Sequence, residues 1–197
     1  MTKRSCMFIF SAILLLTSLA TAATLPKLEI GTTAPAFVGK DIDGVEHSLD
    51  KYLGENLVVL MFIATECPVS NDYNERMVEL AKLYTGKKVT FIGINSNKQE
   101  TVEEIKEHAQ KNGLPFEIIK DGNNIIADLY GAQVTPEAYV LDAKGILRYH
   151  GRIDDSRDPD DMTSQDLKAA LDALLEGREV PRPETKAFGC GIKRIKK

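Results

Sequence analysis

Apolar side chains are concentrated in two runs that mark the centre of the fold. Residues 57–63 are continuously apolar and residues 89–95 nearly so, which is typical of strands covered on both faces of a sheet. Other segments repeat apolar residues every three or four positions, which is the period of an amphipathic helix. This spacing predicts helices over residues 69–83, 101–112 and 164–176.

Shorter elements fill the chain between these segments. Residues 31–49 form an entry loop and a hairpin with Asp43-Gly44 at its tip, since Asp-Gly favours a two-residue hairpin turn. Further patterns predict a short helix over residues 124–130 and strands over residues 116–119, 137–141 and 146–150. Strands that alternate with helices, followed by a terminal hairpin and helix, imply an α/β fold with a mixed central sheet flanked by helices.

The first 22 residues have the pattern of a signal peptide. Lys3 and Arg4 precede an apolar stretch over residues 7–19, and Ala-Thr-Ala follows at residues 20–22. A charged start, an apolar core of this length and an Ala-x-Ala end are typical of a cleaved export signal. We therefore expect cleavage after Ala22 and a mature protein in the periplasm or outside the cell.

The rest of the chain divides into one domain over residues 23–177 and a tail over residues 178–197. The end of the tail is basic and has no helical period, so the tail is expected to be disordered. It contains Gly189-Cys190-Gly191. The two glycines would give the backbone freedom to bring this sulfur to a partner.

Composition narrows the set of partners. The chain has 197 residues and a formal net charge of −4; signal cleavage would make it more negative, so no overall basic field favours nucleic acid. No second apolar run is long enough to span a membrane. Of three cysteines, Cys6 would be lost with the signal, which leaves Cys67 and Cys190. In an oxidising compartment such a pair can join, either as a structural staple or as a redox couple.

Cys67 is the strongest candidate for a reactive residue. It follows the apolar run of residues 57–63 and precedes Pro68, and proline is favoured at the start of a helix. A helix N-terminus stabilises negative charge, and the thiolate is the nucleophilic form of cysteine. The neighbouring Glu66 should oppose this effect by raising the pKa of the thiol. The alternative is that Cys67 is a small buried core residue.

Three short motifs lie before the entry hairpin, at the turn that contains Cys67 and before the strand over residues 137–141. They are Gly-Thr-Thr-Ala-Pro-Ala-Phe at residues 31–37, Phe-Ile-Ala-Thr-Glu-Cys-Pro at 62–68, and Val-Thr-Pro at 134–136. With them, the chain resembles the thioredoxin-like superfamily, in its branch of exported AhpC/TSA- and TlpA-like redoxins. The resemblance implies a thioredoxin-like fold with a cis Thr135-Pro136 bond facing the active cysteine. The backbone of Thr135 could then pair with an extended peptide. Without the resemblance, Pro136 would be a proline that starts a strand.

A peroxiredoxin-like site differs from this sequence at three positions. It would offer a proline, a threonine and a facing arginine, and the aligned positions hold Leu60, Ala64 and Pro136. Peroxide activation needs donors aimed at the peroxide oxygens. Thr65, Arg148 or Arg152 would have to supply them.

The favoured interpretation is a thiol–disulfide oxidoreductase. Cys67 would attack a disulfide, and Cys190 would resolve the mixed disulfide, because Ser70 occupies the position of the second cysteine of a thioredoxin. Two alternatives stay open for Cys190: an unpaired thiol, or a staple that restricts the unfolded chain by about 4–5 kcal/mol. The client would be a disulfide-containing protein or a small thiol or peroxide, and the electron donor and the direction of flow stay open.

Two other functions also stay open. One is a peroxiredoxin-like thiol peroxidase with Cys190 as the resolving thiol. The other is a non-enzymatic binding module for a metal or a client peptide. A soft-metal site would need converging ligands, whereas His47, His108 and His150 are scattered, so no metal or cofactor is expected. The acidic run at residues 154–161 lacks the spacing of a Ca²⁺ loop and is expected to be a solvated loop.

Overall fold

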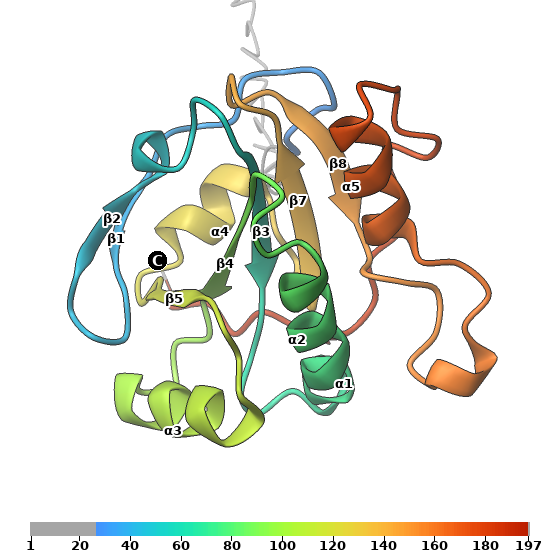
Figure 1. Cartoon of the computed structure of the whole chain (residues 1–197). Helices are drawn as coiled ribbons and strands as arrows, with labels where there is room; N and C mark the ends of the chain where they lie inside the picture. Colours follow the sequence, from blue (N-terminus) through green and yellow to red (C-terminus); the bar gives the residue numbers. More distant parts are fainter. Residues whose placement is uncertain (1–26, 197) are drawn as a thin grey trace, which may run out of the picture.

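The computed structural model describes residues 27–196, and its centre is a five-stranded sheet (Figure 1). The strands are β3 (Leu57–Phe62), β4 (Val89–Asn95), β5 (Glu117–Lys120), β7 (Glu137–Leu141) and β8 (Leu147–Gly151). They lie in the order β5-β4-β3-β7-β8. The first three are parallel, and β7 and β8 are antiparallel to their neighbours. The mixed sheet expected from the sequence is confirmed. The predicted signal peptide lies outside the described residues.

The central strand explains why both faces of the sheet are covered. In β3, Val59 and Met61 pack into one apolar cluster, and Leu60 and Phe62 pack into another on the opposite face. Helices that cover the first face are α2 (Asn74–Leu83), α3 (Val102–Asn112) and α5 (Asp166–Leu175). The second face is covered by α4 (Ile125–Tyr130) and by the segment that holds the hairpin β1 (Val38–Lys40) and β2 (Glu46–Ser48). Short 3₁₀ turns span Leu49–Lys51 and Pro159–Asp161.

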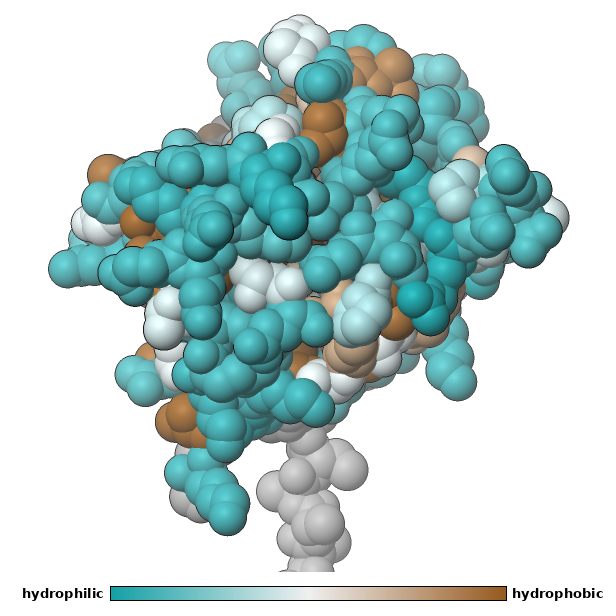
Figure 2. Space-filling view, turned by 90° about the horizontal axis from the view of Figure 1, so that it is seen from below, coloured by the Kyte–Doolittle hydropathy of each residue, from teal (hydrophilic) through white to brown (hydrophobic). Residues whose placement is uncertain are grey.

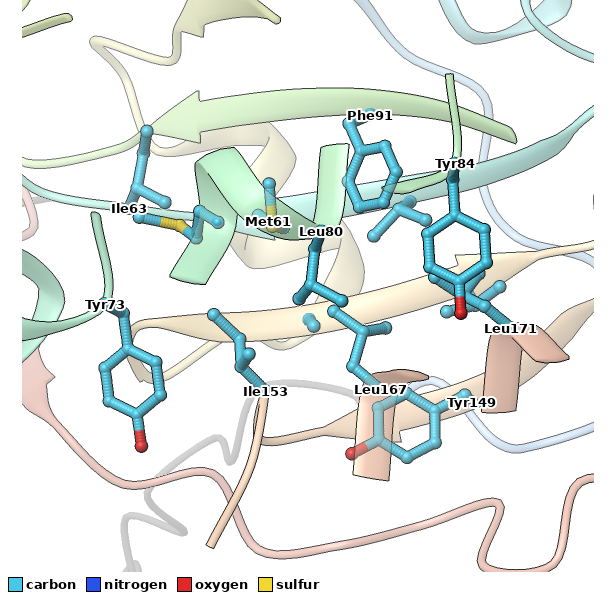
Figure 3. Close-up of a cluster of buried hydrophobic side chains, with 14 of the residues drawn as sticks. Met61, Ile63, Tyr73, Leu80, Tyr84, Phe91, Tyr149, Ile153, Leu167 and Leu171 are labelled. Atoms are coloured by element: carbon cyan, nitrogen blue, oxygen red, sulfur yellow. The ribbon is translucent and has the colours of Figure 1, made fainter. Parts of the chain in front are cut away.

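The helix predicted over residues 69–83 is divided in two. The first part is α1 (Pro68–Asp72), Tyr73 interrupts the helix, and α2 begins at the next residue. The Tyr73 ring is buried in the first cluster (Figure 3), and its hydroxyl donates to Asp154 at 2.8 Å. Packing thus holds the ring of Tyr73, and a hydrogen bond holds its hydroxyl. This anchoring accounts for a break that the apolar periodicity does not reveal.

The prediction of a disordered tail is wrong. Within the tail, β9 (Cys190–Gly191) pairs antiparallel with β6 (Val134–Thr135) in a separate two-stranded sheet. In Figure 1 the C-terminal trace, drawn in red, crosses below the lower ends of the central strands toward β5. Ile192 is buried in the second apolar cluster. The tail is ordered by contacts with distant segments, which is why its own sequence pattern gives no sign of order.

No helix within residues 27–196 is long and apolar enough to cross a bilayer. Figure 2 shows the face below the sheet, which is largely hydrophilic with separate small hydrophobic patches.

Candidate active site

Cys67 lies in the turn between β3 and α1. It is the N-cap residue of α1, Pro68 occupies the first turn of the helix, and the Ser70 N–H donates to the Cys67 sulfur at 3.3 Å. A sulfur that accepts a backbone N–H is stabilised when it carries negative charge. Only 3 % of Cys67 is exposed to solvent. Cys67 therefore lies at a helix start, as predicted, and it is also buried, as the alternative interpretation expected.

Cys190 comes to this turn from the C-terminal tail. The two cysteines are joined in a disulfide with a Cα–Cα distance of 5.9 Å, which is within the range that a disulfide requires. The bond closes a sequence separation of 123 residues. Of the three states left open for Cys190, the unpaired thiol does not apply to this structure. A staple and a redox couple share this geometry.

Thr135 and Pro136 flank the disulfide, as the resemblance implied. The Thr135–Pro136 peptide bond is cis. The carbonyl oxygen of Thr135 lies 3.3 Å from the Cys67 sulfur, and Thr135 is the partner of Cys190 in the β6–β9 ladder. All four residues expected from the sequence are thus brought together in one place.

Ser70 stabilises the turn that carries Cys67, called the active turn below. It stands at the position where a thioredoxin has its second cysteine. Its side chain is fully buried, and its oxygen accepts the Ala64 N–H at 3.1 Å. This bond ties the end of β3 to α1. Glu66, which precedes Cys67 in the sequence, accepts a hydrogen bond from the side-chain amide of Gln99 at 2.9 Å.

Glu100 is a component of the site that the sequence did not reveal. It is 1 % exposed and accepts backbone N–H groups of both residues before Cys67, from Thr65 at 2.9 Å and from Glu66 at 3.2 Å. The side-chain amides of Asn95 and Asn97 also donate to it. Burial raises the pKa of Glu100, but these four donors outweigh burial, and its pKa falls below the ordinary value. The only sequence signal was a polar cluster directly after the second apolar run.

Glu137 fixes the chain on the other side of the site. It is buried and accepts the N–H groups of Gln133 at 2.7 Å and Val134 at 3.1 Å. Its second oxygen pairs with His150 at 2.6 Å. Burial raises the pKa of this carboxyl, yet the bonds from His150 and the two N–H groups bring it below its ordinary range. Two buried carboxylates therefore position the two loops that meet at the disulfide.

The arginines considered as peroxide donors are bound to carboxylates. Arg148 pairs with Asp142 at 2.7 Å, and Arg152 pairs with Asp166 at 2.7 Å. Both guanidinium groups are thus engaged by carboxylates, and neither is free to donate to a peroxide.

The solvated-loop expectation for residues 154–161 is wrong at its start. Asp154 is 2 % exposed and pairs with Arg76 at 2.7 Å, and Asp155 accepts the N–H groups of Thr163 and Ser164. The remaining acidic side chains of the run are exposed.

The three histidines are also engaged by neighbouring side chains. They contact Asp41, Asn74 and Glu137. No group of three or more potential metal ligands occurs in the part of the chain that the structure describes.

Comparison with known proteins places these features in a family. Residues 30–150 match the AhpC/TSA family. The chain belongs to this family. It is 28 % identical over 145 residues to the thiol-disulfide oxidoreductase ResA of Geobacillus thermodenitrificans, covering 74 % of this chain and 78 % of that protein. It is 29 % identical over 134 residues to the chloroplastic peroxiredoxin Q of Suaeda salsa, covering 64 % and 61 % respectively.

Solved structures support the same fold. A hypothetical protein of Sinorhizobium meliloti is 32 % identical with a TM-score of 0.80, over 86 % of this chain and 97 % of that one. A putative thiol:disulfide interchange protein DsbE of Chlorobium tepidum has a TM-score of 0.65 at 20 % identity, over 76 % and 99 % of the two chains. These similarities confirm the prediction of a thioredoxin-like fold and of a thiol redox enzyme.

Proposed function

We propose that this protein is an exported thiol–disulfide oxidoreductase with Cys67 as the nucleophile and Cys190 as the resolving thiol. The observation that carries the proposal is the Cys67–Cys190 disulfide, formed at the N-cap of α1 and beside the carbonyl of Thr135. Cys190 takes the role that Ser70 cannot fill, because an alcohol does not resolve a mixed disulfide. Export would supply the oxidising compartment in which such a pair cycles.

The chemistry consists of two exchange steps. The Cys67 thiolate attacks one sulfur of a client disulfide; the client S–S bond breaks, and the leaving thiolate takes up a proton. The Cys190 thiolate then attacks the Cys67 sulfur, which releases the second client thiol and forms the Cys67–Cys190 disulfide. The client gains two electrons and the protein loses two. A dithiol donor must return them, and the reverse sequence of steps would oxidise a client instead.

The surrounding residues position the sulfurs for these steps. The Ser70 N–H stabilises the Cys67 thiolate. Thr135 presents backbone groups at which an extended client could pair, and Pro136 lies directly after them. Glu100 and Glu137 act through the backbone and are positioning residues.

The proposal is tested by single substitutions in a Cys6→Ser background, so that only the two site cysteines remain. Cys67→Ser should abolish the acceleration that the protein gives to the reduction of a disulfide substrate by dithiothreitol. Cys190→Ser should retain the first step and accumulate a mixed disulfide on Cys67, detected by intact mass. Ser70→Ala should retain exchange, since its side chain contributes one hydrogen bond to Ala64. Turnover by the Cys67→Ser variant would overturn the assignment.

Export is tested separately on the protein made in its native host. Mass spectrometry of the intact chain should find an N-terminus near residue 23. Retention of Met1 on the mature protein would contradict the proposed signal cleavage.

A thiol peroxidase is the second candidate, because the relatives include peroxiredoxin Q at 29 % identity. Its first step would be attack of the Cys67 thiolate on a peroxide, giving a sulfenic acid that Cys190 converts to the disulfide with loss of water. The measurement is peroxide consumption with a dithiol donor. The ion pairs of Arg148 and Arg152 lead us to expect slow consumption compared with disulfide exchange.

A further inference from the structure

The tail segment 188–192 occupies the site as an extended peptide would. Cys190 pairs with Thr135 and Gly191 pairs with Val134 in an antiparallel ladder. The Ile192 N–H continues the pairing by donating to the Gln133 carbonyl at 2.9 Å. The edge of β6 therefore already accepts a strand whose cysteine is bonded to Cys67.

Side chains on both sides of Cys190 enter apolar surroundings. Phe188 packs edge-on against Tyr73 at a ring-centroid distance of 6.3 Å and belongs to the first apolar cluster. Ile192 is 8 % exposed and belongs to the second cluster. These two clusters lie on opposite faces of the central sheet. The segment thus places an aromatic side chain before the cysteine against one cluster and an aliphatic side chain after it against the other.

The two glycines beside Cys190 are not equivalent. A Cβ atom at Gly189 would lie 1.9 Å from the Thr135 carbonyl oxygen, whereas a Cβ at Gly191 would meet nothing within 4 Å. Real Cβ atoms do not approach backbone that closely, so only the position before the cysteine requires glycine. The site therefore distinguishes the two neighbours of the bound cysteine.

We propose that the segment 188–192 is a tethered substitute for the client, and that its sequence reports what the edge of β6 that it occupies, called the groove below, prefers. The partner is an extended polypeptide segment with an aromatic residue two positions before its cysteine, glycine immediately before it and an aliphatic residue two positions after it. This inference rests on the proposed function and adds its substrate class. Such a segment binds the reduced protein, because in the oxidised protein Cys190 holds the groove.

The tail competes with any such segment, because contacts beyond the disulfide hold it in place. The backbone of Lys193 bonds to Lys98 and to the Asn97 side chain, each through one hydrogen bond. The Ile195 N–H donates to Asn124 at 2.8 Å. A tethered segment acts at an effective concentration in the millimolar range. A client must therefore displace the tail, and a tail that fits less well should admit clients faster.

The first test measures sequence preference in the full-length Cys6→Ser/Cys190→Ser protein, in which Cys67 is the single thiol. The probes are peptides of residues 184–194 whose cysteine forms a disulfide with thionitrobenzoate. Attack by Cys67 joins the peptide to the protein and releases thionitrobenzoate, which is followed by absorbance, with intact mass confirming the adduct. The unaltered peptide should react at least tenfold faster than its Gly189→Ala form and at the same rate as its Gly191→Ala form. Phe188→Ala and Ile192→Ala should also slow it.

The second test releases the tail in the protein itself. Gly189→Ala, added to Cys6→Ser/Cys190→Ser, places a methyl group against the Thr135 carbonyl and should expel the tail; Gly191→Ala is the matched control. The unaltered peptide should be captured at least tenfold faster by the Gly189→Ala protein than by the control. Circular dichroism confirms that both variants are folded.

The outcomes separate this inference from the proposed function. If Cys67 reacts with a small aromatic disulfide but captures all peptides at one rate, the client preference is refuted and the thiol exchange stands. Equal capture by the Gly189→Ala and Gly191→Ala proteins would refute the competition by the tail. If Cys67 reacts with no disulfide at all, the proposed function itself fails.

Discussion

The substitution Glu100→Gln removes a charge that holds the active turn, and its cost can be worked out from the geometry. One carboxylate oxygen accepts the Thr65 N–H and the Asn95 amide, and the other accepts the Glu66 N–H and the Asn97 amide. A glutamine has one accepting oxygen and one donating NH₂ group. Whichever way the amide is turned, its NH₂ faces two donors. At least two of the four bonds are lost.

The magnitude follows from the burial of these groups. A buried donor that loses its partner costs about 1–3 kcal/mol, so the two lost bonds give roughly 2–6 kcal/mol. That is a large share of the total stability of a typical domain, which is about 5–15 kcal/mol. Glu104→Gln is the matched control, because Glu104 lies in the first turn of α3, close to Glu100 in sequence, accepts bonds from the N–H and hydroxyl of Thr101, and is exposed. Its loss should be far smaller, since water replaces the bonds.

The assay is urea unfolding of both variants in the oxidised state, followed by far-UV circular dichroism. The pH dependence gives an independent check. The pKa of Glu100 is lowered from 4.5 in the folded protein, so its contribution to stability is present above that pH and is lost as the pH falls through the lower folded value. The stability difference between wild type and Glu100→Gln should therefore shrink as the pH falls below about 4.5. A cost under about 1 kcal/mol at neutral pH, or one equal to that of Glu104→Gln, would refute this account of the turn.

Two further substitutions test the remaining anchors of the site. Cys190→Ser should lower the unfolding free energy relative to the oxidised wild type by about 4–5 kcal/mol, given the sequence separation of 123 residues, and the difference should vanish when both proteins are measured in excess reductant. Asp154→Asn should lower stability by roughly 3 kcal/mol, because it leaves the charge of the largely buried Arg76 without a neutralising carboxylate. Asp160→Asn, at an exposed position of the same acidic run, should leave the melting temperature unchanged; equal effects at both positions would contradict the distinction.

Local patterns were sufficient to predict most of the framework. The strand over residues 57–63 is observed as β3 over Leu57–Phe62, and the helix over residues 101–112 as α3 over Val102–Asn112. Both follow from periodicity within the segment itself. The placement of Cys67 at a helix start could also be predicted, because Pro68 and the preceding apolar run are adjacent to it in sequence.

Features that depend on distant partners could not be predicted. Asp154 looks like one member of an acidic run, and contacts with the distant Tyr73 and with Arg76, 78 positions earlier, bury it. Glu100 likewise looks like an ordinary acidic residue near a helix start, while its partners Thr65 and Glu66 lie some 35 positions away. No period or composition reports such pairs. Adjacent residues were therefore enough to predict that Cys67 lies at a helix start, but they did not reveal Glu100, whose carboxylate binds the backbone of the turn before it.

The position of the second sulfur has a consequence for how the protein works. In a turn with both cysteines on one helix, the disulfide leaves the neighbouring strand edge free. Here Ser70 holds the turn and the second sulfur arrives on β9, so forming the Cys67–Cys190 disulfide also fills the edge of β6. Oxidation therefore locks the tail segment covalently onto this edge. In the proposed cycle, the disulfide must be reduced before an extended client can pair with Thr135, and the reduced tail would still compete through its bonds to Asn97, Lys98 and Asn124. In this cycle, the redox state of Cys67 and Cys190 controls access to the groove.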